Sequence, residues 1–219
     1  MPVSNRIFDV FQPGLIRGSE HLPYDPKKAY AYVEHPKEGW RVYLRSCIFL
    51  HPIPAENGKS NAVFHPSHFL VVKRRGARYS TPTWEPPKGQ MEGKDGIHGR
   101  KSILQLLTEN VMRETEEESH ITSIENLRHT GLVFQSQETD FSPNTYFQYH
   151  IFQGFITPEQ IKQSYDTFAW IKEHPKAFAR WRRDRREKDA VAWFHPERTP
   201  VNPRWCPDIV ALYLQSFIV

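Results

Sequence analysis

The fold depends most on residues 102–119, which have the sequence SILQLLTENVMRETEEES. Ser102 is followed three residues later by Gln105, the spacing of a capping box in which each side chain bonds the other residue's backbone N–H. Residues with high helix propensity continue to about Ser119. The sequence therefore predicts a long, well-capped helix over this stretch.

Three glutamates lie near the C-terminal end of this predicted helix. Glu114, Glu117 and Glu118 are three and four residues apart, so they share one face. At about 100° per residue, Ile103 and Leu107 project within about 20° of Glu114. The carboxylates thus continue an apolar stripe, whereas a merely solvated acidic face would lie opposite it.

This arrangement is unfavourable unless a cation lies nearby. Like charges four residues apart cost roughly 0.2–0.5 kcal/mol per pair in an isolated helix. Carboxylates in the last turns also oppose the negative end of the helix dipole. Arg113 supplies one positive charge, and a hard divalent cation with oxygen ligands can supply the rest. From the helix alone, a Glu-rich surface helix remains an equal alternative.

A second signal lies upstream, in the sequence Trp84-Glu85-Pro86-Pro87-Lys88-Gly89. Its two prolines fix φ and remove two backbone donors, so a regular strand is not expected to continue through them. Gly89 permits close backbone approach. Such a turn can direct carbonyl oxygens at a metal ion or leave room for a phosphate.

Composition limits the class of protein. The chain has 219 residues, a formal net charge of +4 and two cysteines, which excludes a disulfide scaffold and a four-cysteine zinc site. No apolar run approaches the roughly 20 residues that a membrane span needs. The N-terminus lacks the layout of a signal peptide. We therefore expect an intracellular, cytoplasmic protein without a membrane segment; its oligomeric state is left open.

The order of predicted elements indicates a mixed α/β (α+β) fold. Residues 1–40 show no clear period and are expected to be an extended N-terminal arm, followed by one domain over 41–219. The predicted strands are 41–50, 69–73, 131–137, 146–156 and 190–194. The predicted helices are 102–119, 157–168, 175–188 and one from Pro207 to about Phe217.

At this point the sequence resembles the Nudix hydrolase superfamily, whose box is G-x5-E-x7-R-E-U-x-E-E-x-G-U, with U a bulky apolar residue. The second half of the box is present as RETEEESHI over residues 113–121. The first half is represented by Gly89 followed, after five residues, by Asp95. The surrounding turn is similar to that of members acting on dinucleoside polyphosphates, diphosphoinositol polyphosphates or capped RNA. The resemblance implies an α/β/α sandwich with a mixed sheet.

Four features depart from the family pattern. Asp95 replaces glutamate, Thr115 replaces an apolar residue, and His120 replaces glycine. Seventeen residues separate Asp95 from Arg113 instead of seven, an insertion of ten that falls at about 96–105. We expect the insertion to divide between a loop and an N-terminal extension of the helix. The role of Asp95 therefore stays open.

The resemblance implies Mg²⁺ or Mn²⁺ bound by Glu114, Glu117 and Glu118, and by a backbone carbonyl of Lys88 or Gly89. Mg²⁺ prefers oxygen ligands, retains waters and bridges to substrate phosphates. A bound water would attack at phosphorus while the metal neutralises phosphate charge.

Catalytic roles follow from the same resemblance. Arg113 would orient a glutamate through charge-assisted hydrogen bonds. The general base is a box glutamate in some members and a later carboxylate in others; here the later candidates are Glu187 and Asp189, and both can equally be solvated residues. Lys88 and Trp84 are candidate substrate-binding residues, although core packing is the commoner role of a tryptophan.

Positive charge is concentrated in residues 171–188, which hold eight Lys/Arg and three Asp/Glu and so carry a local charge of +5. This segment belongs to a predicted basic helical insertion at about 157–188. Arg182, Arg183, Arg185 and Arg186 are the candidate phosphate-binding residues, with Trp170 and Trp181 among them for base stacking. The alternative is a solvated helix that only improves solubility.

The sequence thus predicts a Mg²⁺- or Mn²⁺-dependent pyrophosphohydrolase acting on a nucleoside-diphosphate-linked substrate. Capped or 5′-phosphorylated RNA, dinucleoside polyphosphates and diphosphoinositol polyphosphates are rival substrates, with RNA slightly favoured by basicity and length. A non-catalytic module of the same fold that binds nucleotides or RNA is the alternative from another class. An unrelated Glu-rich helical interaction protein is a third.

Overall fold

The computed structural model describes residues 6–22, 25–53, 64–96, 100–137 and 141–218. Two compact units are distinguished by their internal contacts. Unit 1 comprises residues 1–46, 89–110 and 133–150, and unit 2 comprises 47–88, 111–132 and 151–219. Helix α2 (Ile103–Ser119) and strands β3 (Arg41–Pro52), β7 (Glu125–Gln137) and β8 (Thr145–Ile156) contribute residues to both units.

The larger sheet has the strand order β1-β2-β3-β8-β7, and β6 (Lys88–Gln90) also pairs with β3. Strands β2 and β3 are antiparallel. Strands β3 and β8 run in the same direction, because Arg41 N donates to Asn144 O (2.8 Å) and Ile53 N donates to Ile156 O (3.0 Å). The sheet is therefore mixed, which confirms the predicted α/β class.

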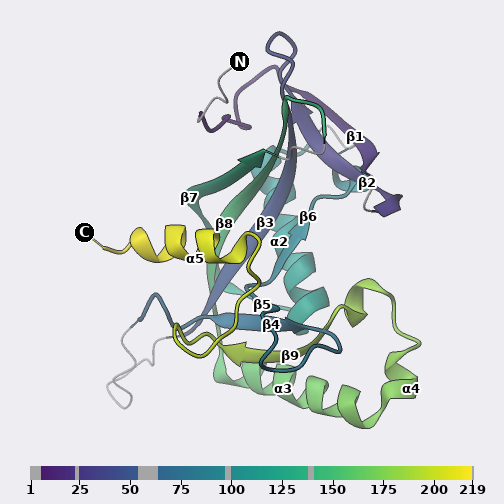
Figure 1. The fold of residues 1–219 in the computed structure, drawn as a ribbon, viewed down its shortest axis with the longest axis vertical. Helices are drawn as coiled ribbons and strands as arrows, with labels where there is room; N and C mark the ends of the chain where they lie inside the picture. The colour runs from purple at the N-terminus through teal and green to yellow at the C-terminus, as the bar shows by residue number, and fades with distance from the viewer. Residues whose placement is uncertain (1–5, 23–24, 54–63, 97–99, 138–140, 219) are drawn as a thin grey trace. The chain divides into compact units, whose positions relative to one another are not determined.

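Residues 16–34 differ from the extended arm expected for 1–40. Strands β1 (Ile16–Leu22) and β2 (Asp25–Glu34) form an antiparallel pair that joins the sheet beside β3 (Figure 1). Leu22 and Tyr30 are buried against Tyr43 and Phe147, and this apolar cluster accounts for the pairing. The missed signal is a short alternation of aromatic and small residues between prolines, which is too brief to identify a strand by period alone.

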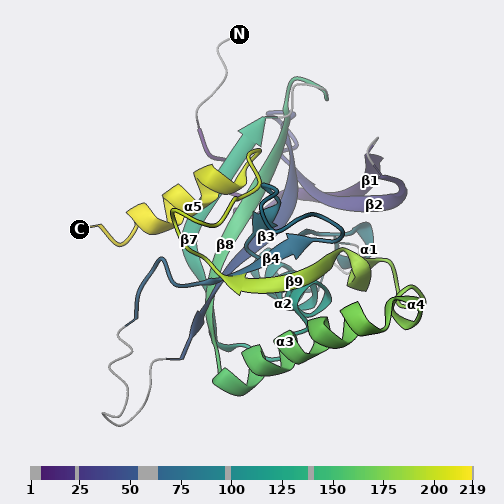
Figure 2. The same cartoon turned by 60° about the horizontal axis from the view of Figure 1, so that its bottom comes forward.

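Unit 2 contains a smaller sheet of three strands in the order β5-β4-β9. Its strands are β5 (Trp84–Glu85), β4 (Leu70–Arg74) and β9 (Lys188–Trp193), and β4 is antiparallel to both neighbours. Helix α3 (Pro158–Glu173) runs alongside β9 (Figure 2). Thr157 and Gln160 form a complete capping box at its start. This sheet positions the turn that contains Pro87 and Lys88.

Helix α5 (Cys206–Gln215) packs on the unit 2 parts of β3 and β8. The ring of Tyr213 stacks on Phe49 with centroids 3.7 Å apart, and its hydroxyl contacts His51 Nε2 at 2.6 Å. Gln153 on β8 donates to the same hydroxyl at 2.9 Å. Because side chains alternate along a strand, Ile48 and Leu50 point to the opposite face. Strand β3 is therefore buried on both faces here.

The predicted helix at 102–119 is confirmed as α2, and its capping box is present. Ser102 N donates to Gln105 Oε1 (2.8 Å), and Gln105 N donates to Ser102 Oγ (3.2 Å). Of the insertion expected at about 96–105, Gly96 is the last residue of α1 (Gly93–Gly96) and residues 103–105 begin α2, while 97–99 lie outside the described residues.

The predicted helix at 175–188 is wrong over most of its length. Only α4 (Pro175–Phe178) and a 3₁₀ turn at Asp184–Arg186 are helical. Arginines crowded at three- and four-residue spacing repel each other along a helix, which disfavours a continuous one. Within the described ranges, none of the helices combines the length and the apolar character that a membrane-spanning segment needs.

Candidate active site

The C-terminal half of α2 places its polar residues on a buried face. Thr115 Oγ1 donates to Val111 O (2.7 Å), and Ser119 Oγ donates to Thr115 O (2.7 Å). Both side chains are fully buried. The hydroxyl at Thr115, where the family pattern has an apolar residue, is therefore satisfied by its own helix and carries no penalty for burial.

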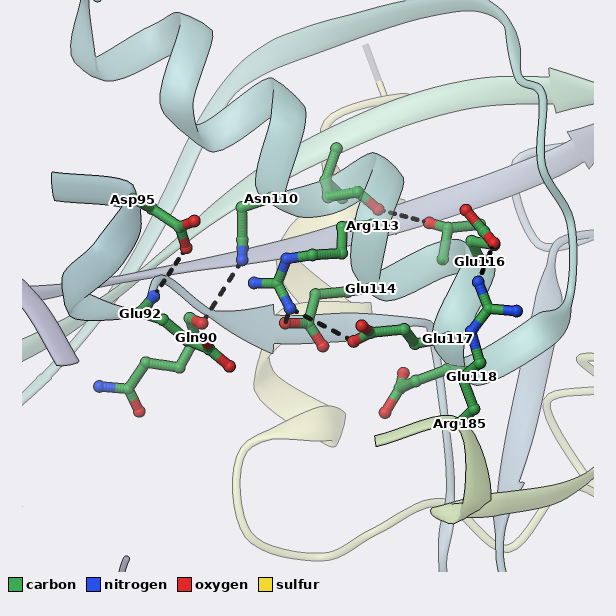
Figure 3. Close-up of polar contacts among 12 residues, drawn as sticks. Gln90, Glu92, Asp95, Asn110, Arg113, Glu114, Glu116, Glu117, Glu118 and Arg185 are labelled. Carbon is green, nitrogen blue, oxygen red and sulfur yellow. Dashed lines mark hydrogen bonds and ion pairs between the residues drawn. The ribbon is translucent and has the colours of Figure 1, made fainter. Parts of the chain in front are cut away.

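Arg113 joins two of the predicted site glutamates. Its NH1 lies 3.0 Å from Glu114 Oε1 and 3.2 Å from Glu117 Oε2, and all three side chains are largely shielded from water. Figure 3 shows the guanidinium directed at both carboxylates, whereas Glu116 points away to Arg185. Two carboxylate oxygens that touch one nitrogen are close enough to share a single cation. The acidic face is thus directed inward, as the sequence predicted from the apolar stripe.

Glu118 is the buried member of the set, with only 5% of its side chain exposed. Lys88 N donates to Glu118 Oε2 at 3.0 Å. Lys188 Nζ lies 3.1 Å from Glu118 Oε1. The Pro87-Lys88 turn and α2, 30 residues apart at this contact, therefore meet through a backbone donor. The expected backbone carbonyl ligand is not what faces Glu118; a backbone N–H does.

Glu85 completes a charge cluster, which we define as Glu85, Lys88, Glu118 and Lys188. Lys188 Nζ donates to Glu85 Oε1, and Lys88 Nζ lies 3.3 Å from the same oxygen. Asn202 Nδ2 donates to Glu85 Oε2 at 3.2 Å. Two carboxylates and two ammonium groups thus alternate within unit 2.

The pKa values of the cluster follow from burial and from the neighbouring charges. Burial alone would raise the pKa of Glu85, but Lys88 and Lys188 outweigh it and lower the value to about 2. Burial raises the pKa of Glu118 above its ordinary value, against the opposing effect of Lys188 and Lys88. Burial would lower the pKa of Lys188, but the carboxylates of Glu118 and Glu85 raise it. Lys188 therefore remains a cation.

Sequence reasoning missed Glu85 and Lys188. Glu85 had a signal, since it lies inside the Trp84–Gly89 motif. Lys188 had none: it is one of eight Lys/Arg in 171–188, and of these eight, all within the described ranges, it alone is buried. Its burial depends on where β9 begins, which composition does not determine.

The two candidate bases near β9 have different surroundings. Asp189 Oδ1 lies 2.5 Å from Lys73 Nζ, and its Oδ2 accepts from Gly76 N at 2.8 Å. Glu187 is exposed, and its carbonyl accepts from Arg75 N at 2.8 Å. Asp189 is thus a structural counter-ion, and neither side chain contacts the glutamates of α2 through a hydrogen bond or ion pair described in this part of the chain.

The basic segment is only partly joined to this site. Arg185 NH2 donates to Glu116 Oε1, on the side of α2 away from Arg113. Arg182 and Arg183 are exposed, and Arg186 is half-buried. Trp170 stacks on His174 (4.6 Å between centroids) and on Trp181 (5.8 Å). An exposed basic and aromatic surface therefore exists on this part of unit 2.

Trp84 is buried and cannot contact a ligand directly, whereas the side chain of Lys88 is partly exposed. Trp84 is 3% exposed, and its Nε1 donates to Tyr79 O at 3.0 Å. The structure thus places Trp84 in the packed interior and not at an open base site. Lys88 Nζ lies 4.8 Å from the centroid of the Trp205 ring. Its side chain remains 22% exposed, so it retains access to a ligand.

Asp95 lies in α1, within unit 1. Its Oδ2 accepts from Glu92 N at 2.9 Å, a local contact that helps to form the turn (Figure 3).

Only some of the predicted ligand residues are placed so that they could bind a divalent metal ion. No group of three or more His, Cys, Asp or Glu poised around a metal position is found among the described residues. Glu114 and Glu117 fit such an ion, since their oxygens already share the cationic Arg113. Glu118 fits less directly, because each of its oxygens already contacts a donor.

Comparison with known proteins gives similarity only among solved structures. No family model matches the chain, and no curated protein matches it. A NUDIX hydrolase from Nitrosomonas europaea shares 14% identity over 80% of this chain and 89% of its own, with a TM-score of 0.42. A mutT/nudix family protein from Listeria innocua shares 18% over 80% and 94%, with a TM-score of 0.41. A C. elegans Ap4A hydrolase shares 15% over 80% and 97%, with a TM-score of 0.40. The solved structures to which this chain is similar thus include members of the family that its sequence resembles.

Proposed function

We propose that this chain is a Nudix-type hydrolase that cleaves a pyrophosphate linkage with the help of Mg²⁺ or Mn²⁺. One observation carries the proposal: Lys88 N donates to Glu118 Oε2 at 3.0 Å. This contact joins the two halves of the box, the Pro87-Lys88-Gly89 turn and the Arg-Glu-x-x-Glu-Glu sequence of α2. Glutamates that merely decorated a surface helix would have no reason to meet that turn.

The division of roles follows from exposure. Glu114 and Glu117, with side chains 15% and 18% exposed, are the carboxylates we assign as metal ligands. When bound, a divalent ion neutralises phosphate charge and lowers the pKa of its water. Arg113 contacts both glutamates and fixes their orientation. The base is then one of these two glutamates, because Asp189 is engaged by Lys73 and exposed Glu187 makes no described hydrogen bond or ion pair with the glutamates of α2.

The substrate class rests on charge. Lys88, with its partly exposed ammonium, is the proposed contact for a substrate phosphate. Exposed Arg182 and Arg183 extend the positive surface, and Arg185 and Arg186 lie beside them. A capped or 5′-phosphorylated RNA uses both the phosphate contact and the partly exposed stack of Trp170 and Trp181, so it is the substrate we favour. Diphosphoinositol polyphosphates have no base and use the phosphate contact alone, whereas dinucleoside polyphosphates carry two bases and are the closer rival.

The test compares glutamates from one helix. Glu117→Gln should lower Mg²⁺-dependent kcat by at least about 100-fold, since it removes a ligand charge from the metal site. Glu118→Gln should lower it as well, for another reason: it removes the carboxylate charge that pairs with the buried Lys188 ammonium beside the turn. Turnover is measured with Mg²⁺ or Mn²⁺ on a panel of substrates: capped RNA, dinucleoside polyphosphates, nucleoside triphosphates, nucleotide sugars and inositol pyrophosphates.

Glu116→Gln is the matched control, because Glu116 points to Arg185 on the other side of α2. It should retain wild-type turnover. Equal activity in the Glu116, Glu117 and Glu118 variants would reject the catalytic assignment.

A non-catalytic nucleotide- or RNA-binding module is the second candidate. The ion pair between Glu118 and Lys188 favours it, because a carboxylate held by an ammonium group is less available to a metal. In that case every substrate in the panel would stay intact while at least one of them bound.

A further inference from the structure

The proposed function gives no role to Lys188, a buried cation placed among acidic groups. Its side chain is 6% exposed, it donates to Glu85 Oε1, and its Nζ lies 3.1 Å from Glu118 Oε1. Glu118 in turn accepts from the backbone of Lys88. The ammonium therefore bridges a box glutamate and the turn that faces it.

The strand that carries Lys188 is shaped around it. In the pairing of β4 with β9, Lys73 lies opposite Ala190 but Arg74 lies opposite Lys188, so the register shifts between Lys73 and Arg74. Such an irregularity re-aims a side chain and is common beside active sites. The neighbouring Asp189 turns to Lys73. Lys188 is thereby directed at the glutamates while the rest of the basic segment stays at the surface.

Stability does not explain a buried ion pair of this kind. Removing two charges from water costs several kcal/mol per ion, and apolar residues of similar volume often replace such pairs without loss. A function at this position accounts for the charge better than packing does.

The charges of the site indicate what that function is. Glu85, Glu114, Glu117 and Glu118 contribute four negative charges, and Lys88, Arg113 and Lys188 contribute three positive ones. The net charge is therefore −1, and one divalent ion brings it to +1. Without Lys188 the net charge of the same site would be −2. One divalent ion would only neutralise it, and a second would be needed before the site attracted a polyphosphate.

We propose that the Lys188 ammonium takes the place of a second metal cation at this site. It pairs with Glu118, so that Glu114 and Glu117 alone remain as carboxylate ligands for a divalent ion. Lys188 is then a positioning residue that limits how much metal the site takes. The inference rests on the proposed function, since it assumes that the glutamates of α2 bind a metal.

The experiment measures Mn²⁺ binding by electron paramagnetic resonance on the full chain without substrate. Lys188→Met alone leaves two buried glutamates with one fewer cation and can fail to fold, so the main variant is the charge-balanced Lys188→Met with Glu85→Gln. Freeing Glu118 should tighten Mn²⁺ binding by about tenfold, or add a bound ion, within the range that neighbouring groups exert on metal sites. Adding Glu118→Gln should return binding to the wild-type level.

Two matched variants complete the set. Lys188→Arg keeps the positive charge and should retain wild-type Mn²⁺ affinity, whereas exposed Lys176→Met should change nothing. Thermal unfolding establishes that each variant is folded.

Unchanged Mn²⁺ binding in the folded double variant would overturn this inference alone. A gain that persists after Glu118→Gln would overturn it as well. Wild-type protein that binds no Mn²⁺ would instead contradict the proposed function, and this inference with it.

Discussion

His120 ends α2 in a conformation that suits another residue. Its φ is 61°, in the left-handed region where a β-carbon costs roughly 1–2 kcal/mol. Glycine, which the Nudix pattern places here, would avoid this cost. The histidine ring instead packs against Phe168 (4.8 Å between centroids) and Trp181 (5.6 Å). Ring contacts thus offset backbone strain, and the departure from the pattern is explained by packing in unit 2.

The same burial makes His120 sensitive to acid. Burial, aided by the charge of Arg185, lowers its pKa to about 4 from an ordinary 6.5. The folded state therefore binds fewer protons than the unfolded state, and stability is lost as pH falls from 6.5 towards 4. His51, with a pKa lowered by burial to about 4, adds to the same loss.

We predict that His120→Asn reduces this acid-induced loss, because asparagine tolerates the left-handed conformation and does not titrate here. The free energy of unfolding, measured by urea denaturation at pH 7.5 and pH 4.5, should fall less in this variant than in the wild type. Exposed His21→Asn should retain the wild-type difference. An identical fall in the His120 variant would show that this ring is not protonated on unfolding.

At the scale of elements, α2 was predictable because two independent signals agree. An apolar period and a capping box both place its start near Ser102, and both cap bonds form. The glutamate face followed from the helix period. The segment after α4 was not predictable in this way, since Trp181 turns to stack on Trp170 and only tertiary structure reveals that contact. Lys188 escaped prediction for the same reason.

Ser102→Ala should lower the free energy of unfolding by about 1 kcal/mol, because it leaves an N-terminal donor of α2 without its side-chain acceptor. Urea denaturation would measure the change. Gln163→Ala, at an exposed position inside α3, is the matched control and should shift stability by a few tenths of a kcal/mol. A loss as small as that of the control would mean that the cap is dispensable.

At the scale of the whole chain, charge is distributed by segment. Residues 171–188 carry a local charge of +5, while the rest has 21 basic and 22 acidic residues. The sequence predicted this concentration, and the structure leaves most of it exposed within unit 2. What the sequence did not predict is the hairpin of β1 and β2, whose pairing depends on a cluster with Tyr43 and Phe147 from distant parts of unit 1.

If RNA is the substrate, its binding should weaken steeply with salt. Replacing Arg182 and Arg183 together by Gln should reduce the slope of log K against log [salt] by about 1.4, from two lost phosphate contacts to a single strand. Fluorescence anisotropy with a 5′-phosphorylated oligonucleotide measures the slope. Exposed Lys37→Gln, from another part of the chain, is the control. An unchanged slope in the double variant would remove these arginines from the RNA contact.

Positive and negative charges alternate among Glu85, Lys88, Glu118 and Lys188, and this limits which substitutions the buried cluster tolerates during evolution. A change that neutralised either Glu85 or Lys188 alone would leave an uncompensated buried charge, at a cost of about 3–5 kcal/mol. Natural variants should therefore replace the two positions as a pair, so that positions 85 and 188 co-vary although they are 103 positions apart in the sequence. Relatives that retain one and lose the other should be rare.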